Sequence, residues 1–459
     1  MKKTVGFKES VALLLLMLVI LGTGVIHFGL APNVPVLVVI GLLLGWLRLR
    51  GFSWEELMAG IKEGISTAVI PIFIFLLIGA LIAVWIQAGV IPSLMVVGFH
   101  LISARYFAPS VFLVCSLVGV AIGSGFTTIS TVGIALFGMG TTLGVSPALT
   151  AGAIISGAVF GDKMSPLSDS TNLAAAVAGA DLFAHLKNML WSTIPAFLCS
   201  LAGFFALGLT SHQATSGRLA STVAVLTSHF AISWWAALPI VLMFACAWRR
   251  VPAIPTLFLN IAVTIGLIYA WRPHFRLTAL VNLIQDGYVA KTGNQAVDSL
   301  LTRGGISAMM GTVALILMTL ALGGILMHTG IIEQAMAPLT ARLTKPGRLI
   351  LVALCAGIGV NLFVGEQYLS VILPGNAFKG AFSRIKLAPL ALSRVLEDGG
   401  SVINYLIPWG VAGSFAAGTL GVSVTAFLPF TFFSLLSPLF SFLSGITGIG
   451  LKWQAGAQE

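Results

Sequence analysis

The chain of 459 residues is 58% hydrophobic and only 8% charged, and its mean hydropathy is +1.04. Soluble domains carry about 25% charged residues, so this composition excludes a soluble globular protein. A net charge of +10 would suggest nucleic acid as the partner of a soluble protein. In a membrane protein, the same charge indicates cytoplasmic Lys and Arg that face anionic lipid.

These properties predict an all-α polytopic membrane protein whose partner is the lipid bilayer. A helix needs about 20 apolar residues to cross a bilayer, so the chain has room for roughly 10–14 spans. A first series is predicted at 10–30, 34–48, 65–87, 91–104, 108–142, 146–179 and 187–209. A second series is predicted at 229–247, 253–271, 305–328, 331–344, 349–378, 387–414 and 422–445.

Several of these segments depart from a simple span. Segments 91–104 and 331–344 are short enough to lie at the interface instead. The more polar stretches 51–63 and 276–303 carry both signs of charge and are predicted as interfacial amphipathic helices. Glycine, proline and polar residues interrupt four of the predicted spans, at 108–142, 146–179, 349–378 and 387–414.

The two series form an internal repeat. At an offset of 241, Gly64 falls on Gly305, and Gly89 falls on Gly330. At an offset of 236, Gly123 falls on Gly359, Asp162 on Asp398, and Ser165 on Ser401. The sequence therefore predicts a first repeat over 1–210 and a second over 211–459. Seven spans per repeat is an odd number, so the second repeat would enter the membrane inverted.

The distribution of Lys and Arg tests this topology. With the N-terminus inside, fourteen Lys and Arg fall on the cytoplasmic side and eight fall outside. This excess favours a multi-pass protein of the inner (plasma) membrane with both termini in the cytoplasm. If the two short segments did not span, each repeat would contain six spans, and the inversion would require a re-entrant segment.

The most polar of the interruptions is Gly161–Asn172, which lies between two uncharged apolar stretches. Polar groups at this depth are costly unless they pair or line a watery cavity, so they are functional candidates. The candidate ligands here are Asp162, Ser165, Asp169, Thr171 and Asn172. In the matching interruptions, at 123–131, 359–368 and 397–409, they are Thr127, Thr128, Glu366, Gln367, Asp398, Ser401 and Asn404.

Five of the fourteen acidic residues lie in these interruptions: Asp162, Asp169, Glu366, Glu397 and Asp398. Such a concentration indicates binding of a cation, a proton or both. Hard cations prefer the oxygen ligands that these segments supply, and we place Na⁺ at Asp162 and Asp169. Alternatively, some of these acids serve only as charge partners of Lys163 and Arg394. In particular, Arg394 and Glu397 would share a helix face.

The relative placement of the two sodium-site carboxylates is open. Asp162 and Asp169 would share a face of an intact helix, but Pro166 disfavours helix at the residue before it. One carboxylate that alternates between a proton and Na⁺ is a minimal antiport device. We predict no cofactor beyond the transported Na⁺ and H⁺.

The stretch Gly161–Asn172, followed by Leu173, Ala178-Gly179 and Asp181-Leu182-Phe183, resembles the signature of the NhaC-type Na⁺/H⁺ antiporter family, which includes malate/lactate antiporters. Second-half motifs of that family resemble Glu366–Ser370, Leu373–Gly375, Ser393-Arg394, Glu397–Gly399 and Leu406–Trp409. The resemblance extends from about 60 to 420. It implies membership of a larger ion-transporter superfamily with inverted repeats, elevator-like alternating access and, commonly, homodimers.

The chain departs from the family pattern mainly in the second half. The family usually has Asp where Glu366 stands, and Ser-Pro-Leu-Ile-Pro-Trp-Asn at 404–410. In the first half, a Ser-Ser-Trp-Thr-Thr-like segment is here Ser124–Thr128. These departures bear on which substrate is transported more than on how transport occurs.

We therefore predict a secondary active Na⁺/H⁺ antiporter rather than an enzyme. The alternative is an ion-coupled exchanger of organic acids, such as malate and lactate, or of amino acids, in which Lys163 and Arg394 would hold a carboxylate. A passive channel is less favoured, because paired polar interruptions suggest an occluded site. An intramembrane hydrolase would need a motif such as His-Glu-x-x-His, which the sequence lacks.

Overall fold

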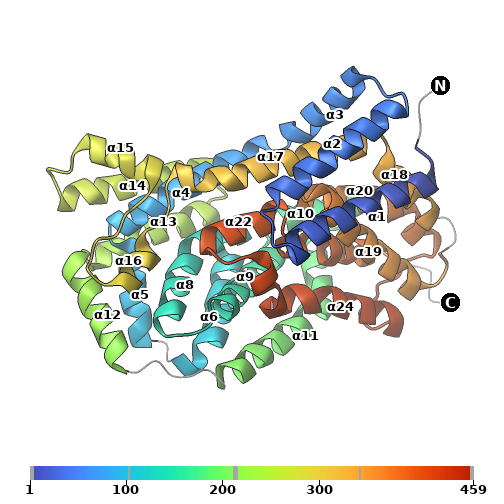
Figure 1. Cartoon of the computed structure of the whole chain (residues 1–459). Helices are drawn as coiled ribbons and strands as arrows, with labels where there is room; N and C mark the ends of the chain where they lie inside the picture. Colours follow the sequence, from blue (N-terminus) through green and yellow to red (C-terminus); the bar gives the residue numbers. More distant parts are fainter. Residues whose placement is uncertain (1–4, 102–103, 210–215, 341–342, 455–459) are drawn as a thin grey trace.

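The computed structural model describes residues 5–101, 104–209, 216–340 and 343–454. Within these ranges the regular elements are helices, and the only β pairing is two isolated bridges, Tyr288 with Arg303 and Leu387 with Trp453. A helix satisfies its backbone hydrogen bonds internally, as a lipid-embedded chain requires. The predicted all-α class is confirmed (Figure 1).

The helices of the first half are α1 (Phe7–Gly22), α2 (Asn33–Leu49), α3 (Trp54–Ser66), α4 (Val69–Gln87), α5 (Val90–Leu101), α6 (Phe107–Ile122), α7 (Gly125–Thr128), α8 (Ile134–Thr142), α9 (Pro147–Met164), α10 (Asp169–Ala178) and α11 (Leu182–Leu209). Those of the second half are α12 (Ser216–His229), α13 (Ala237–Trp248), α14 (Ala253–Trp271), α15 (Leu277–Asp286), α16 (Gln295–Leu301), α17 (Ile306–His328), α18 (Ile331–Met336), α19 (Pro346–Val364), α20 (Gln367–Arg384), α21 (Pro389–Leu396), α22 (Val411–Leu420), α23 (Val424–Phe427) and α24 (Phe432–Thr447).

Six helices in the described ranges are long and apolar enough to cross a membrane: α1 with its π-helical extension to His27, α4, α11, α14, α17 and α19. Two bent pairs, Ser221–His229 with Trp234–Trp248 and Val411–Leu420 with Val424–Phe430, could each add one span. Four shorter apolar helices, α2, α6, α24 and the part of α5 over Val90–Phe99, are also present. The described residues thus contain six to eight span candidates, and the number of 10–14 spans stays a prediction. The chain is therefore a multi-pass membrane protein.

Apolar and charged side chains are distributed between the surface and the interior as a lipid environment requires. Large apolar side chains are exposed on outer helices, as at Leu16 on α1, Leu37 on α2 and Val241 on α13. Charged groups such as Lys163 and Asp398 are buried instead. Lipid accepts exposed apolar groups and rejects unpaired polar ones.

The described part of segment 331–344 does not form a span, and its alternative placement at the interface stays a prediction. Helix α18 has only 6 residues, and a short 3₁₀ turn that contains Pro338 follows it at Ala337–Thr340. At a rise of about 1.5 Å per residue, so short a helix cannot cross a hydrocarbon core about 30 Å thick.

Glycines allow α3 and α4 to pack closely on α17, and these three helices lie along the upper side of Figure 1. A Cβ on Gly64 would overlap the Leu320 carbonyl, and a Cβ on Gly324 would overlap the Gly60 carbonyl. At the other end of the contact, the Gly305 N–H donates to the Gly79 carbonyl at 2.7 Å. The segment predicted as interfacial at 51–63 is thus a helix that packs on a long apolar one.

We expect Gly324→Ala to destabilise the protein by about 1–3 kcal/mol, because its methyl group would overlap backbone atoms of α3. Gly311→Ala is the matched control, because it lies on the same helix with nothing within 4 Å of its Cβ position. Thermal unfolding in detergent would compare the two variants. Equal melting temperatures for both would contradict this account of the α3–α17 contact.

Candidate functional site

Two chain breaks have the same local construction. Helix α6 ends at Gly123, whose φ is 73°, and Ser124 begins the next helix by accepting the Thr127 N–H at 3.3 Å. Helix α19 ends at Gly365, whose φ is 71°, and the Glu366 carboxylate accepts the Leu369 N–H at 2.9 Å. Positive φ favours glycine, and a side-chain oxygen at the N-cap satisfies a free N–H.

The predicted interruptions at 108–142 and 349–378 are therefore present, but the second one is displaced from its predicted start. Gly359 lies inside α19, and the break occurs at Gly365. The offset of 236 that matched Gly123 with Gly359 was wrong at this position, since the matching break is 242 residues on. The reason is local: Gly365, not Gly359, adopts a positive φ.

The other two breaks are also at their predicted places. Helix α9 ends at Met164, Pro166 follows, and Ser168 caps α10. In the second half, α21 runs into a π-helical turn at Glu397–Ser401 and a 3₁₀ turn at Asn404–Leu406 before α22 begins. Each half therefore contains two interrupted segments.

The two breaks of each half touch one another. A Cβ on Gly123 would lie 2.9 Å from the Ser165 hydroxyl oxygen, so the α6–α7 break packs directly on the α9–α10 break. In the second half, the Val411 N–H donates to the Gly365 carbonyl at 2.8 Å.

A buried ion pair joins the two halves. The Lys163 ammonium lies 2.6 Å from Oδ1 of Asp398, and their side chains are 1% and 0% exposed. Ser437 on α24 donates to Oδ1 at 2.6 Å, and Ser192 on α11 donates to Oδ2 at 2.9 Å. The same two hydroxyls accept from Lys163. Every polar atom of the pair is satisfied, so Asp398, predicted as an ion ligand, is already occupied by a fixed cation.

Arg394 does not pair with Glu397, contrary to the predicted grouping of these charges. Its guanidinium donates to the Ser444 hydroxyl at 2.8 Å and to the Gly450 carbonyl at 3.3 Å. Both acceptors lie at the C-terminal end of α24, where the helix dipole favours a cation. The arginine points to that helix end although Glu397 is only three residues away.

Glu397 itself faces the first half. Its Oε1 accepts the Ser170 hydroxyl at 3.1 Å, and the Ser401 hydroxyl donates to Ser170 at 3.1 Å. Oε2 is buried without a hydrogen-bond partner among the described residues. Ser170 and Ser401 therefore connect the two halves beside an incompletely satisfied carboxylate.

Asp162 is the buried carboxylate of the first-half breaks. Its Oδ2 faces the start of α7, where a Cβ on Gly125 would lie 3.6 Å from it. The Tyr405 hydroxyl approaches the same glycine from the second half, at 2.5 Å from that Cβ position, and has no partner in the described part of the chain. Asp162 thus lies where breaks from both halves converge.

Asp169 is exposed, whereas Asp162 is buried, so the two predicted sodium-site carboxylates differ in access. They are close enough to interact electrostatically, and together with Glu366 they act on the Tyr368 hydroxyl, which belongs to a side chain 37% exposed. Gln367 adds a buried oxygen, Oε1, that has no hydrogen-bond partner in the described structure. The carboxylates of this region thus range from the exposed Asp169 to the buried Asp162.

The remaining predicted ligands hold the backbone of the breaks. Thr171 donates to the Lys163 carbonyl at 3.0 Å, and the exposed Asn172 donates to the Pro166 carbonyl at 3.0 Å. Thr128 donates to the Ser124 carbonyl at 2.9 Å. As placed here, these side chains position the chain around the carboxylates.

Asn404 has a similar role in the second half. Its Nδ2 donates to Asn361 Oδ1 at 2.6 Å, and its Oδ1 accepts the Ala412 N–H at 3.1 Å. Asn361 in turn donates to the carbonyls of Gly399 and Gly400. This network holds the π-helical turn that carries Glu397 and Asp398.

Sequence reasoning did not select Ser192, Ser437, Asn361 or Tyr405 as site residues. Each is a single polar residue within or beside an apolar helix, and such residues usually bond to their own helix backbone. The available signal was that Asn361 and Tyr405 fall inside the stretches already recognised as interruptions. For Ser192 and Ser437 no local signal exists, because only packing brings them to Asp398.

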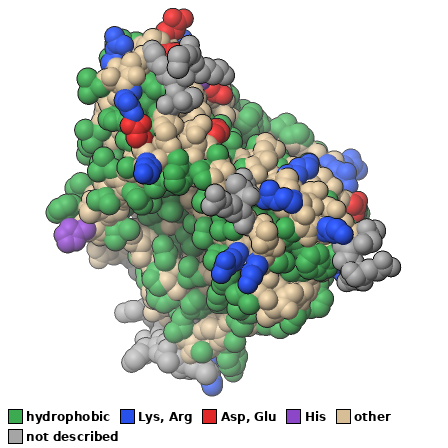
Figure 2. Space-filling model, turned by 90° about the vertical axis from the view of Figure 1, so that its right-hand side faces the viewer, with side chains coloured by type: hydrophobic (Ala, Val, Ile, Leu, Met, Phe, Trp, Pro, Cys, Tyr) green, Lys and Arg blue, Asp and Glu red, His purple; other side chains and the backbone are tan. Residues whose placement is uncertain are grey.

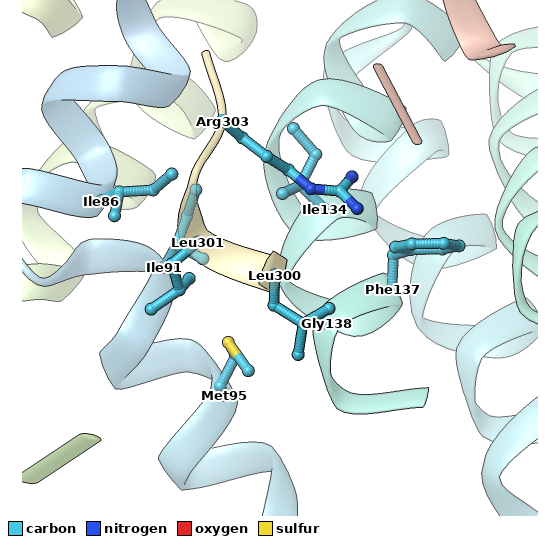
Figure 3. A pocket seen from close by; sticks show the side chains of 9 residues that line it. All are labelled: Ile86, Ile91, Met95, Ile134, Phe137, Gly138, Leu300, Leu301 and Arg303. Atoms are coloured by element: carbon cyan, nitrogen blue, oxygen red, sulfur yellow. The ribbon is translucent and has the colours of Figure 1, made fainter. Parts of the chain in front are cut away.

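A separate small cavity lies away from the carboxylates, between α5, α8 and α16 (Figure 3). It is lined by Ile86, Ile91, Met95, Ile134, Phe137, Gly138, Leu300, Leu301 and Arg303. The Arg303 guanidinium donates to the Leu420 carbonyl at 3.1 Å and lies 5.3 Å from the centre of the Phe137 ring. The arginine is thus engaged at the end of α22.

No group of three or more Asp, Glu, His or Cys side chains that could hold a metal ion occurs in residues 5–101, 104–209, 216–340 and 343–454. A monovalent cation needs fewer charges than a divalent one. The oxygens around Asp162 fit Na⁺ in kind, because hard cations take carboxylate, hydroxyl and carbonyl ligands.

Comparisons with known proteins identify the family of the chain. The Na⁺/H⁺ antiporter family matches residues 6–171 and 157–449. The chain belongs to this family. It is 39% identical over 450 residues to the Na⁺/H⁺ antiporter NhaC of Alkalihalophilus pseudofirmus, covering 98% of this chain and 97% of the relative. The predicted family is confirmed, and as expected its members are antiporters rather than enzymes.

Other relatives carry different names. The chain is 34% identical over 465 residues to the arginine/ornithine antiporter ArcD of Halobacterium salinarum, covering 97% of this chain and 93% of the relative. It is 33% identical over 414 residues to the malate-2H⁺/Na⁺-lactate antiporter of Bacillus subtilis, covering 89% and 87%. The relatives of this chain thus include exchangers named for inorganic ions, for amino acids and for organic acids.

Proposed function

We propose that this member of the family exchanges Na⁺ for H⁺ by alternating access, with Asp162 binding Na⁺ and H⁺ in turn. The observation that carries the proposal is the position of Asp162, buried at the convergence of breaks from both halves. Asp398 is neutralised by Lys163, and Glu366 caps α20. Asp162 has no ion pair among the described residues, so its charge is available to a mobile cation.

Asp169 and Glu366 would serve the same ion on its way in. Asp169 is exposed at the start of α10 and interacts electrostatically with Asp162. An exposed carboxylate attracts cations to the rim, and the buried one binds them with less competition from water. We therefore place Na⁺ between Asp162 and Asp169, with Asp162 as its principal ligand.

Alternating access would use two inverted repeats, over 1–210 and 211–459. The contacts between α3–α4 and α17 support this division. Gly64 packs on Leu320, and Gly79 packs on Gly305. At the offset of 241, Gly305 is the counterpart of Gly64, and Leu320 is the counterpart of Gly79. If the two repeats are interchanged, the Gly64–Leu320 contact therefore becomes the Gly305–Gly79 contact, as a two-fold axis between the repeats requires.

We propose the cytoplasmic side from charge. Figure 2 shows Lys and Arg gathered on the face at the end of the molecule where α1 begins. Predicted cytoplasmic residues such as Arg48, Lys62, Lys379 and Lys386 are exposed. The positive-inside rule favours this end as cytoplasmic. The termini themselves, 1–4 and 455–459, lie outside the described residues, and a homodimer stays a prediction.

Purified protein in proteoliposomes would test the exchange. An imposed Na⁺ gradient with an internal pH dye is expected to drive proton movement with Na⁺ alone. Malate, lactate, arginine and ornithine would then be added singly. Proton movement that occurs only with one of these solutes would replace Na⁺/H⁺ exchange by the organic-solute alternative, and no movement under any condition would refute both.

The alternative, an organic-acid or amino-acid exchanger, is favoured by the names of two relatives. The positions of the two buried cationic side chains, Lys163 and Arg394, favour Na⁺/H⁺ exchange over this alternative. A substrate carboxylate would need an accessible cation, but Lys163 is bound to Asp398 and Arg394 to the end of α24. Na⁺/H⁺ exchange needs neither of these groups to be released.

A further inference from the structure

Glu397 is a second buried carboxylate that the exchange at Asp162 does not use. Its side chain is 0% exposed, Oε2 has no partner in the described structure, and Oε1 accepts a hydrogen bond from Ser170. An ionised carboxylate in such surroundings is costly unless a cation is near. Glu397 therefore holds a proton whenever no mobile cation lies close to it.

Two buried hydroxyl groups, those of Ser170 and Ser168, form a row that extends from this carboxylate toward the start of α10. The Ser168 and Ser170 hydroxyl oxygens are 3.1 Å apart, and Ser170 is 3.1 Å from Oε1 of Glu397. Ser168 lies directly before the exposed Asp169. Each hydroxyl can both donate and accept, so a proton can pass along the row by rotation of O–H bonds. Oxygens in direct hydrogen-bond contact leave no space between them for Na⁺.

Several charges surround Glu397, and they belong to different elements. Asp162 and Lys163 on α9 act on it electrostatically. In its own segment, Asp398 is paired with Lys163, and Arg394 is bound at the end of α24. Na⁺ at Asp162 would add a positive charge beside Glu397 and stabilise its ionised form. By reciprocity, a proton on Glu397 would weaken Na⁺ binding at Asp162.

We propose that Glu397 is a proton-binding group of the exchange cycle, reached through Ser168 and Ser170 and distinct from the Na⁺ ligand Asp162. The inference rests on the proposed function. One proton joins a carboxylate oxygen of Glu397 and another joins Asp162 when Na⁺ leaves, and both depart when Na⁺ returns. The site then carries no net charge with two protons and one negative charge with Na⁺. Exchange of two H⁺ per Na⁺ is electrogenic.

The test compares Glu397→Gln with the wild type in proteoliposomes. In the wild type, a membrane potential set with K⁺ and valinomycin should drive Na⁺-dependent proton movement at equal Na⁺ on both sides. Gln is neutral and similar in size, so Glu397→Gln should exchange one H⁺ per Na⁺ and lose the response to potential. Its half-saturating Na⁺ concentration should rise, because Gln has the charge of a protonated Glu397. At saturating Na⁺ its ²²Na⁺/Na⁺ self-exchange should stay within about threefold of the wild type, because Asp162 is unchanged.

Two further variants test the hydroxyl row. Ser170→Ala should slow Na⁺/H⁺ exchange by about tenfold or more relative to ²²Na⁺/Na⁺ exchange, because it removes the proton relay. Glu397→Asp keeps a carboxyl and should keep the two-to-one ratio. Ser200→Ala is the control: this buried hydroxyl on α11 donates only to the Ala196 carbonyl and should change neither rate.

The outcomes separate this inference from the proposed function. A wild type without Na⁺-driven proton movement would refute Na⁺/H⁺ exchange itself. A Glu397→Gln variant that keeps the response to potential would overturn the role of Glu397. Loss of ²²Na⁺/Na⁺ exchange in folded Glu397→Gln would make Glu397 a sodium ligand instead. If that variant does not fold, equal slowing of both rates in Ser170→Ala overturns the proton row.

Discussion

Asp162→Asn is expected to reduce Na⁺/H⁺ exchange to the level of empty liposomes while the protein still inserts and folds. Asparagine keeps the size of the side chain and one oxygen, but it can neither carry a negative charge nor exchange a proton. Asp162 is buried where breaks from both halves converge and has no ion pair among the described residues, so we expect no neighbouring residue to replace both properties. The measurement is Na⁺-driven proton flux in proteoliposomes, with gel filtration as the check on folding.

Asp169→Asn is the matched comparison, and the structure changes what we expect of it. Because the sequence places Na⁺ at both Asp162 and Asp169, it predicts by itself that either substitution abolishes exchange. Because Asp169 is exposed and Asp162 is buried, Asp169→Asn should instead raise the Na⁺ concentration for half-maximal flux by a few-fold, as loss of a solvent-screened charge does. Unchanged transport in both single variants would refute the site.

Lys163→Met is expected to have the largest effect on stability, about 3–5 kcal/mol of destabilisation, because it leaves Asp398 buried without its cation. The double variant Lys163→Met with Asp398→Leu removes both charges and should recover most of that loss. Urea unfolding of the purified protein in detergent would measure both. A double variant as unstable as the single one would show that the pair is not the cause.

Arg50→Met provides the control for this experiment. Arg50 and Glu9 also form an ion pair, but their side chains are 48% and 40% exposed. An exposed pair contributes only about 0–1 kcal/mol. If Lys163→Met cost no more than Arg50→Met, burial would not determine the contribution of the Lys163–Asp398 pair.

The positions of the breaks could be predicted from the sequence because local chemistry determines them. Gly123 supplies a positive φ, Pro166 interrupts a helix, and Ser168 begins the next one. These effects act within a few residues, so a single chain reveals them. The error at Gly359 has the same origin, since a distant offset was applied where the local conformation of Gly365 was decisive.

The partners of the charged residues could not be predicted in the same way. Proximity along a helix suggested that Arg394 would pair with Glu397, but the arginine lies at the end of α24, and Glu397 faces Ser170. Lys163 pairs with Asp398, 235 residues away. The pairing of charged side chains depends on how the helices pack. The sequence of an apolar helix does not indicate which helices lie beside it.

By itself, the sequence determined the membrane class, the family, the four breaks and the concentration of carboxylates within them. The tertiary structure alone separated those carboxylates: Asp398 is neutralised by Lys163, Asp169 is exposed, and Asp162 is buried where the halves meet. The physical reason is the distance along the chain over which each interaction acts. Backbone breaks follow from a few adjacent residues, whereas burial and ion pairing follow from contacts between segments that only the folded chain brings together.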